Sequence, residues 1–384
     1  MLKINEVLTR AVDNVLPNKE GLASLMAKKK ITLYQGFDPS MPSLHLGNFV
    51  GLTKLRQFQK LGHKVIFLVG DFTGMIGDPT DKQATRKKLT REQVLENAKS
   101  WKKQASMLLD FDGPNAAEIK FNSKWNDMLT FRDLLEITSN FTVQQMIERD
   151  MFQNRLKSNA PIYLHEFLYP VAQAIDSVEM DVDLEIGGSD QLFNMMAGRT
   201  LMKAMKGKEK FVLSMKLLVD KDGNKVGKTT GNALFMDSTP ENFYAGVMSF
   251  PDEVLELAFE LLTEVELSDI KTKINKQPFE EKKKLAFEVI KILWGENKAN
   301  LSQLSFEKTF QKREFSANPT IVENRGTLAV TLSALPTVGS ISQAKRLINQ
   351  GAIDINGEAV TNPGLGTTTG QEIKIGKTTF IKIK

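Results

Sequence analysis

Cysteine is absent from this chain of 384 residues. Without thiols the protein has no disulfide, no zinc–thiolate centre and no cysteine nucleophile. Histidine is scarce, with three in the whole chain, so a histidine inside a motif stands out. No apolar run approaches the ~20 residues that a membrane-spanning helix needs. The first residues, MLKINEVLTRAVDN, also lack the apolar core of a secretory signal, and we therefore expect a cytoplasmic protein that does not bind membranes.

The remaining composition is that of an ordinary globular protein, with 41% hydrophobic and 25% charged residues. The length exceeds that of one average domain, which favours two or three domains. The net charge of +5 is a modest excess. By itself it fits a polyanionic partner and a merely solvated surface equally well. Six basic residues against three acidic ones follow Gly326, so the excess is carried partly by the C-terminal tail.

Strands and helices alternate through the first half of the chain. Residues 31–37 and 64–69 have the apolar, β-branched character of buried strands, and a helix from about Leu46 to Gly62 joins them. This order predicts a βαβ unit. Further strands are expected at 181–186 and 211–219, after a helical stretch. The sequence therefore predicts an α/β fold with a Rossmann-like parallel sheet and a helical insertion at about residues 112–165.

The pattern changes after Pro240, where the periodicity becomes purely helical. A polar segment broken by Pro and Gly then precedes a tail with two short helices and alternating strands. We predict a Rossmann-like domain, an α-helical domain, a linker and a small α+β domain, at residues 1–238, 239–312, 313–326 and 327–384.

The first candidate for chemistry is the segment Ser43–Asn48, between the first strand and the first helix. Open α/β sheets bind ligands at the carboxyl ends of their strands, and helix N-termini attract phosphate. His45 and Asn48 would add side-chain donors, and Gly47 would let a nucleotide approach closely. A helix-capping turn with an incidental histidine explains the same residues.

The second candidate is the loop Lys225–Thr229, which follows the last expected strand of the sheet. Lys225 and Lys228, on either side of Gly227, can fold over a triphosphate and neutralise the charge that develops on it. The glycine spacing differs from that of a P-loop. A solvated basic loop remains the alternative.

A polar stripe runs along the expected helix at residues 163–178. Tyr169, Gln173 and Asp176 share one face of this largely apolar helix, and Tyr34 in the first strand can face the same cavity. Buried polar groups need partners, so the stripe indicates either a bound ligand or an internal hydrogen-bond network. Further residues gather at the ends of the strands, where one edge of the sheet would bring them together: Asp38, Thr73, Asp78, Lys82, Arg86, Gly188, Asp190 and Gln191.

Together these segments resemble the class I aminoacyl-tRNA synthetases, and specifically the bacterial-type tyrosyl-tRNA synthetases. The matching blocks are YQGFDPSMPSLHLGN, VGDFTGMIGDP, IGGSDQ and KVGKT, in this order. The tail SISQAKRLINQGAIDINGEAVTNPG resembles an S4-type RNA-binding module. The resemblance covers nearly the whole chain. It implies that L-tyrosine is activated by ATP to tyrosyl-adenylate, with Mg²⁺ accompanying the pyrophosphate and no metal bound by the protein, and that tyrosine is then transferred to the 3'-terminal adenosine of tRNA(Tyr).

The resemblance also implies roles for individual residues. The phenolic hydroxyl of tyrosine would be recognised by Tyr34 and Asp176. Its ammonium group would be held by Asp78, Tyr169 and Gln173, and the same site would be lined by Thr73 and Gln191. ATP would be bound by Gly36, Asp38, His45, Gly47, Gly188, Asp190 and Lys228. The reacting phosphates would be stabilised by His45, Asn48, Lys82, Arg86, Lys225, Lys228 and Thr229. RNA would be bound by Lys345 and Arg346. The family further implies a homodimer, for which helices at 131–165 are plausible interface material.

Two positions depart from the family pattern: Asn48 replaces the usual histidine, and Gly227 replaces the serine of the general class I loop. Three alternatives follow. A tryptophanyl enzyme shares the expected fold, but the pair Tyr34 and Asp176 and the S4-like tail argue against it. A catalytically silent RNA-binding relative would fit Asn48 and conflicts with the lysine loop. A small-molecule adenylyltransferase would leave the tail without a purpose.

Overall fold

The structure is a computed structural model that describes residues 3–79, 89–227, 233–311, 319–335, 337–356, 358–376 and 379–384. The chain forms two compact units. The first comprises Met1–Thr239 and Gly246–Gly295, and the second comprises Pro240–Ala245 and Glu296–Lys384.

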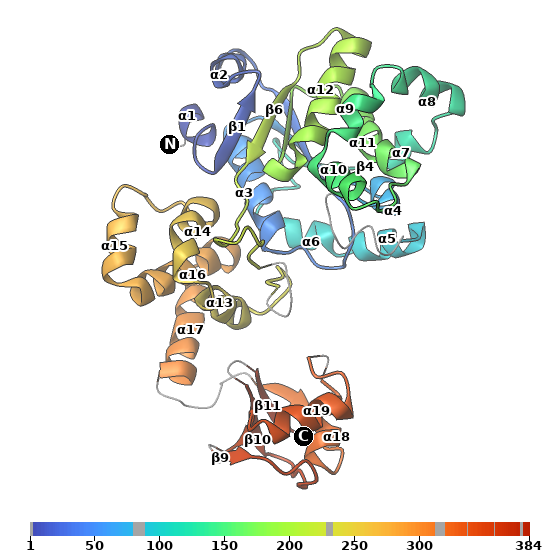
Figure 1. The fold of residues 1–384 in the computed structure, drawn as a ribbon. Helices are drawn as coiled ribbons and strands as arrows, with labels where there is room; N and C mark the ends of the chain where they lie inside the picture. Colours follow the sequence, from blue (N-terminus) through green and yellow to red (C-terminus); the bar gives the residue numbers. More distant parts are fainter. Residues whose placement is uncertain are drawn as a thin grey trace. The chain divides into compact units, whose positions relative to one another are not determined.

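A six-stranded sheet is the centre of the first unit, with the order β1-β6-β5-β2-β3-β4 (Figure 1). The strands are β1 (Val12–Leu16), β2 (Thr32–Phe37), β3 (Lys64–Val69), β4 (Glu118–Phe121), β5 (Leu184–Gly188) and β6 (Phe211–Met215). All neighbours pair in parallel except β1 and β6, which are antiparallel. The chain builds outward from β2 to β3 and β4, then returns to the other side with β5 and β6. The switch point therefore lies between β2 and β5, where such sheets bind ligands.

Helix α3 (Leu46–Lys60) crosses between β2 and β3, as the periodicity predicts. Its first turn is closed by a capping box between His45 and Asn48. A second capping box, between Thr90 and Gln93, starts α5 (Arg91–Ala98). The short helix α6 (Trp101–Ala105) follows α5. The first unit begins with α1 (Ile4–Val7) and α2 (Lys19–Lys28), and α4 (Thr73–Ile76) follows β3.

The segment between β4 and β5 is helical. It contains α7 (Ser123–Asn126), α8 (Phe131–Thr138), α9 (Val143–Ile147), α10 (Asp150–Lys157), the 3-10 helix η2 (Leu164–Phe167) and α11 (Leu168–Glu179). A second 3-10 helix, η3 (Ser189–Gln191), leads into α12 (Leu192–Lys206). The buried residues of α8, α9, α11 and α12 form one apolar cluster, and these helices lie together in Figure 1.

Strand β4 was missed by the sequence analysis, which expected only helix in this region. Its sequence, EIKF, is short and half charged, and every one of its residues is only partly buried. It therefore lacks the apolar run that marks a central strand. Its register against β3, with Phe121 opposite Val69, brings the start of α7 to the carboxyl edge of the sheet.

Helices alone make up the rest of the first unit, as predicted after Pro240. They are the end of α13 (Pro240–Met248), the 3-10 helix η4 (Asp252–Val254), α14 (Leu255–Leu262), α15 (Ile270–Lys276) and α16 (Pro278–Trp294). Arg10 ties the N-terminal segment to this helical part, because its guanidinium donates to the carbonyl oxygens of Phe259, Glu260 and Val265 at 2.7–3.0 Å.

The second unit contains α17 (Glu296–Phe306), a π-helical turn η5 (Glu307–Gln311) and a small domain. In that domain α18 (Leu328–Ser333) and α19 (Ile341–Asn349) pack on a five-stranded sheet ordered β7-β11-β10-β8-β9. Its strands are β7 (Thr320–Val322), β8 (Ile353–Ile355), β9 (Glu358–Val360), β10 (Glu372–Ile375) and β11 (Thr379–Ile383). Isoleucines alternate along β8, β10 and β11, and this places one apolar face against the two helices.

The predicted fold class is confirmed: a parallel-sheet α/β unit with helical additions, and a small C-terminal α+β domain. Within the described residues, no helix is both long and apolar enough to cross a membrane.

Candidate active site

A cavity of about 430 Å³ opens at the carboxyl edge of the parallel sheet, around the switch point between β2 and β5. Its lining comes from the ends of β2, β3 and β5, from the first turn of α3 and from α4, α11 and the loop after β6. The lining includes these predicted site residues: Tyr34, Gly36, Asp38, His45, Gly47, Asn48, Thr73, Asp78, Tyr169, Gln173, Asp176, Gly188, Asp190, Gln191 and Lys225.

Asp176 is buried at one end of this cavity. Its Oδ1 accepts hydrogen bonds from Trp125 Nε1 at 2.8 Å and Asn126 Nδ2 at 3.2 Å, and its Oδ2 accepts one from Asn122 Nδ2 at 3.2 Å. Burial raises the pKa of Asp176 to about 8, although the three N–H donors oppose this shift. The donors favour the ionised form, and once it is ionised Asp176 can accept a hydrogen bond from a ligand hydroxyl.

Tyr34 lies in the same part of the cavity and is fully buried. Its hydroxyl is 2.9 Å from Ser177 Oγ. Burial, and after it the negative charges of Glu185 and Asp176, raise the pKa of Tyr34 well above its ordinary value. Tyr34 therefore keeps its proton and can act as a donor. The O–H of Tyr34 can donate a hydrogen bond, and the carboxylate of Asp176 can accept one. Together they satisfy both hydrogen-bonding functions of a ligand hydroxyl group.

A second polar group extends along the cavity wall from Asp38. Its two carboxylate oxygens accept from Thr73 Oγ1 at 2.6 Å and from the Tyr169 hydroxyl at 2.7 Å. Gln173, one turn further along α11, donates through Nε2 to Glu185 at 2.9 Å. The carbonyl oxygen of the Gln173 amide is therefore the end directed away from Glu185, and it can accept a hydrogen bond from a cationic ligand.

Asp78 supplies a further carboxylate to the wall. It accepts from Gln191 Nε2 at 2.5 Å, and Gln191 in turn accepts from Asn194 Nδ2 at 2.9 Å. The buried guanidinium of Arg149 lies 3.9 Å from Asp78 and stacks 4.8 Å from the ring of Phe193. The wall from Asp38 to Asp78 is thus lined by acceptors, which suits an ammonium group.

The N-terminus of α3 forms another part of the cavity. His45 Nδ1 accepts from the backbone N–H of Gly47 at 3.0 Å, and Asn48 Oδ1 accepts from the backbone N–H of His45 at 2.9 Å. A side chain at position 47 would place its Cβ only 2.9 Å from the His45 ring, so the ring would have to move away from the Gly47 N–H. The N–H groups of Leu46, Gly47 and Asn48 already have acceptors within the protein. The dipole of α3 still makes this end of the helix favourable for phosphate.

Lys225 brings a cation to the opposite rim, where its Nζ is 2.6 Å from Asp190. The loop that carries it is bonded to the start of α3 through main-chain groups. Leu46 N–H donates to the carbonyl of Leu234 at 2.9 Å, and Leu234 N–H donates to the carbonyl of Gly227 at 3.1 Å. The structure therefore joins the two phosphate-binding candidates that the sequence treats separately.

Four predicted site residues lie outside the described residues: Lys82, Arg86, Lys228 and Thr229. The two predicted RNA-binding residues, Lys345 and Arg346, lie on α19 in the second unit, where both are exposed.

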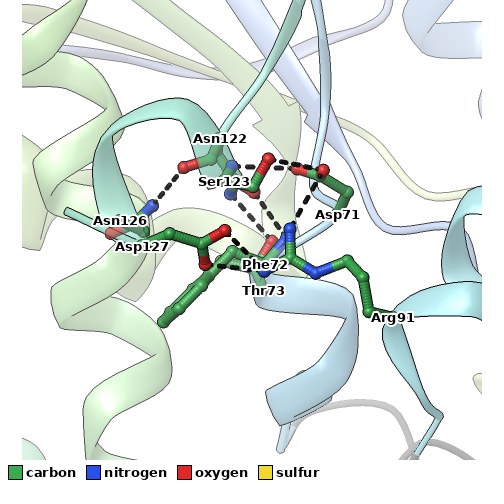
Figure 2. A network of polar contacts seen from close by, with 8 residues as sticks. All are labelled: Asp71, Phe72, Thr73, Arg91, Asn122, Ser123, Asn126 and Asp127. Atoms are coloured by element: carbon green, nitrogen blue, oxygen red, sulfur yellow. Dashed lines mark hydrogen bonds and ion pairs between the residues drawn. The ribbon is translucent and has the colours of Figure 1, made fainter.

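A polar network at the cavity wall and beside it was missed by the sequence analysis. Asn122 lines the cavity, accepts from the backbone N–H of Phe72 at 2.8 Å and donates to Thr73 Oγ1 at 3.0 Å (Figure 2). Asn122 also donates to Asp176 at 3.2 Å. The neighbouring Ser123 is fixed by Asp71, which accepts from its backbone N–H at 2.9 Å and its hydroxyl at 2.6 Å.

The same network continues to Arg91, which bonds both oxygens of Asp127 at 2.6 and 2.9 Å and lies 3.4 Å from Asp71 (Figure 2). An Asn-rich turn directly after a strand, FNSKWN, was the signal available in the sequence. It could not be used because strand β4 itself was not recognised.

Comparison with known families assigns the class. The family model described as tRNA synthetases class I (W and Y) matches residues 26–311, and an S4 domain model matches residues 328–373. Among solved structures, a truncated mitochondrial tyrosyl-tRNA synthetase of Aspergillus nidulans superimposes with a TM-score of 0.66 at 22% identity, covering 80% of this chain and 94% of that one. This likeness shows that the two chains share a fold.

Sequence relatives narrow the assignment. The tyrosine–tRNA ligases of Aquifex aeolicus and Thermotoga maritima are each 38% identical to this chain, over 98% of it and over 97% and 96% of their own lengths. That of Colwellia psychrerythraea is 40% identical over 98% of this chain and 97% of its own. The chain belongs to the family of tyrosyl-tRNA synthetases.

Proposed function

We propose that the protein activates L-tyrosine with ATP to tyrosyl-adenylate and pyrophosphate, and then transfers tyrosine to the 3'-terminal adenosine of tRNA(Tyr). The observation that carries this proposal is the pairing of buried Tyr34 and Asp176 in one cavity of a chain of this family. A tryptophanyl enzyme needs no donor and carboxylate acceptor for a phenolic hydroxyl. The pairing therefore favours tyrosine over the other amino acid of the class.

The amino acid lies, in this proposal, along the wall formed by α11. Tyr34 and Asp176 bond its hydroxyl, and Asp78, Tyr169 and Gln173 hold its ammonium group, with Thr73 and Gln191 beside them. Phenylalanine would leave Tyr34 and Asp176 without partners in a buried site. We expect phenylalanine to be rejected by roughly 10⁴–10⁵-fold. Tyrosyl-tRNA synthetases are themselves the enzymes from which this magnitude is known.

ATP occupies the other half of the cavity. Gly36, Asp38, Gly188 and Asp190 approach the adenosine, and Gly47 leaves room for the phosphates over the start of α3. The tyrosine carboxylate attacks the α-phosphorus, so the protein contributes positioning and charge stabilisation more than acid–base chemistry. We assign stabilisation of the developing charge to a set of donors and cations: His45, Asn48, Lys82, Arg86, Lys225, Lys228 and Thr229.

Magnesium is expected to arrive with the nucleotide. Among the described residues, no cluster of three His, Asp or Glu side chains is arranged as a metal site. Mg²⁺ is commonly bound by substrate phosphates with one or two carboxylates. The ion would then neutralise charge on the phosphate oxygens.

The small C-terminal domain is proposed to bind the tRNA. Lys345 and Arg346 are exposed on α19, whose opposite face is buried through Ala344 and Ile348. Exposed cations on a rigid helix can contact RNA phosphates. This assignment and the three predicted domain boundaries, after residues 238, 312 and 326, remain proposals.

A homodimer is proposed to form through the apolar helices at residues 128–164. Here large apolar side chains are exposed beside an apolar pocket of about 390 Å³: Met128, Phe131, Leu135, Val143, Leu156, Tyr163 and Leu164. An apolar patch of this kind marks an interaction surface. An isologous interface places the same patch of both subunits against itself across a two-fold axis, and a second copy of the chain is the proposed occupant. We place the protein in the cytoplasm.

The test is tyrosine-dependent exchange of labelled pyrophosphate into ATP, with tryptophan and phenylalanine in parallel. Exchange with tyrosine alone is expected. Exchange with tryptophan instead would favour the tryptophanyl alternative. No exchange with any amino acid, from protein that circular dichroism shows to be folded, would contradict the proposal and favour a catalytically silent RNA-binding relative, with Asn48→His as the first reversion.

A further inference from the structure

A second buried polar cluster lies directly behind Tyr34. It consists of Ser177 on α11, Glu185 on β5 and Lys210 just before β6. Ser177 and Lys210 are 0% exposed and Glu185 is 1% exposed. Burying an ion pair costs desolvation energy that apolar side chains would avoid. The position of this pair against the cavity wall therefore calls for an explanation beyond packing.

Lys210 fixes the direction of the hydrogen bonds in this cluster. Its ammonium group carries three protons and no lone pair, so it can only donate. The three partners are Ser177 Oγ at 2.8 Å, the carbonyl oxygen of Met195 at 3.1 Å and the carboxylate of Glu185. Each proton is thus committed, and Ser177 is obliged to accept a hydrogen bond from Lys210.

The hydroxyl proton of Ser177 then has two possible acceptors. The oxygen of Tyr34 lies 2.9 Å away and that of Glu185 lies 3.3 Å away. Hydrogen bonds between a hydroxyl and an oxygen are normally 2.5–3.0 Å long, so the contact to Tyr34 is the better one. Glu185 already accepts from Lys210 and, through its other oxygen, from Gln173.

Tyr34 then has two acceptors for its own proton: Glu185, which also takes part in a hydrogen bond with Tyr34, and a ligand in the cavity. Because Glu185 already accepts from Lys210 and Gln173, the ligand is the better acceptor. Tyr34 lines that cavity, whereas its oxygen receives the proton of Ser177 on the buried side. A chain of hydrogen bonds that all point the same way also polarises its last member and strengthens it as a donor.

We propose that Ser177 and Lys210 are positioning residues that turn the hydroxyl of Tyr34 into a hydrogen-bond donor toward the ligand. The inference rests on the proposed tyrosine site. It assigns a direction to each hydrogen bond of the substrate's phenolic hydroxyl: the substrate oxygen accepts from Tyr34, and the substrate proton is donated to Asp176. Ser177 and Lys210 thereby contribute to the selection of a para-hydroxyl ring although neither lines the cavity.

A double-mutant cycle with Tyr34 separates this role from a packing role. The ratio of kcat/KM for tyrosine to kcat/KM for phenylalanine is measured in pyrophosphate exchange for the wild type, Ser177→Ala, Tyr34→Phe and the double variant. In Ser177→Ala the proton of Tyr34 is free to turn to Glu185. The ratio is expected to fall about tenfold, which is the effect of losing one hydrogen bond. The fall should come from a lower kcat/KM for tyrosine, while kcat/KM for phenylalanine stays the same.

The Tyr34→Phe background decides between the two explanations. There Ser177→Ala is expected to leave the ratio unchanged, because Ser177 acts only through the lost hydroxyl. An equal fall in both backgrounds, or an unchanged ratio when Tyr34 is present, would overturn the inference. A wild type without tyrosine-dependent exchange would instead contradict the proposed function itself.

Two further variants control for the space that alanine leaves. Ser177→Cys fills the volume with a weak donor, so its ratio is expected to stay low. Recovery of the wild-type ratio in Ser177→Cys would show that the cavity, and not the hydroxyl, caused the effect. Ser214→Ala removes another serine that is 0% exposed and whose hydroxyl contacts Asn14 and Asp13 away from the site. It is expected to leave the ratio unchanged.

Discussion

The indole N–H of Trp125 donates a 2.8 Å hydrogen bond to the carboxylate of Asp176, deep in the cavity of the first unit. Burial raises the pKa of Asp176 to about 8, and the bond from Trp125 acts against this rise. The charge of Asp176 near neutral pH is therefore set by a balance between an apolar environment and the N–H groups around it. Removing one of those groups should shift the balance in a known direction.

We predict that Trp125→Phe moves the pH dependence of tyrosine activation to higher pH. Asp176 must be ionised to accept the phenolic proton, so kcat/KM for tyrosine should rise as pH increases through about 8 in the wild type. Loss of a donor to the carboxylate raises its pKa further, by about one unit for a bond worth ~1.5 kcal/mol. Pyrophosphate exchange from pH 6 upward measures the midpoint, and an unshifted midpoint in Trp125→Phe would contradict the prediction.

The buried pair of Lys210 and Glu185 predicts an asymmetric effect on stability. Lys210→Met leaves a buried carboxylate without its counter-charge, and this should lower the free energy of unfolding by about 3–5 kcal/mol. Lys210→Met combined with Glu185→Leu removes both charges and should recover most of the loss. Urea unfolding followed by circular dichroism compares the two variants. A double variant no more stable than the single one would show that the charge is not the cause.

Asp71 should matter for both stability and tyrosine binding. Asp71→Ala removes the acceptor of the backbone N–H and the hydroxyl of Ser123, at an expected cost of about 1–3 kcal/mol. Because Ser123 adjoins Asn122, which bonds Asp176 and Thr73, the KM for tyrosine should rise as well. Thermal unfolding and exchange kinetics measure the two effects.

The control for Asp71 is Lys99→Met, which breaks an exposed ion pair with Glu96. Such pairs contribute little to stability, so both readouts should stay at the wild-type level. A similar loss in the two variants would argue against a specific role for Asp71.

Deletion of residues 327–384 should separate the two steps of the reaction. The described residues that line the cavity all belong to the first unit, so pyrophosphate exchange should continue near the wild-type rate. Charging of tRNA(Tyr) should fall, because the deleted segment contains the matched S4 domain. Full-length protein with Lys345→Ala and Arg346→Ala provides a milder version. Normal charging by the truncated protein would refute this division of labour.

The proposed dimer predicts that one charge in the apolar surface weakens self-association. Leu164 is 79% exposed there, and Leu164→Glu would have to bury a carboxylate between two copies, which is costly. Sedimentation velocity should show a dimer for the wild type and a shift toward monomer for the variant. Leu95→Glu, at an exposed position on α5, is the matched control and should sediment as the wild type does.

The fold was predictable wherever the apolar pattern was strong. Residues 64–69 are expected as a strand and form β3, and the helix expected from Leu46 forms α3. The strand expected at 181–186 begins later, at Leu184, because Asp181 adopts a positive φ of 46° and Asp183 accepts from the backbone N–H of Thr32 before pairing starts. Turns at strand ends are set by such tertiary contacts, which a single sequence does not display.

The site was predictable in part for a related reason. Tyr169, Gln173 and Asp176 could be placed together because helical spacing alone aligns them, and the structure brings them to one cavity. No sequence pattern indicated that Lys210 is buried. A lysine in the charged run KGKEKF is expected to be exposed to solvent. Only the packing of β5, α11 and α12 around it reveals that it is fully buried. Local sequence periodicity does not indicate that a charged residue is buried by elements distant in the chain.

The main-chain bonds that join Gly227, Leu234 and Leu46 have a mechanical consequence. Leu46 N–H donates to the carbonyl of Leu234, and Leu234 N–H donates to the carbonyl of Gly227. These bonds couple the position of Gly227, at the base of the lysine loop, to that of the first turn of α3. Lys225 can therefore move independently of His45 only if these bonds break or the backbone between Lys225 and Gly227 bends. A closing motion that keeps these hydrogen bonds would move His45 together with Lys225. Both sides of the phosphate site would then approach the nucleotide at the same time.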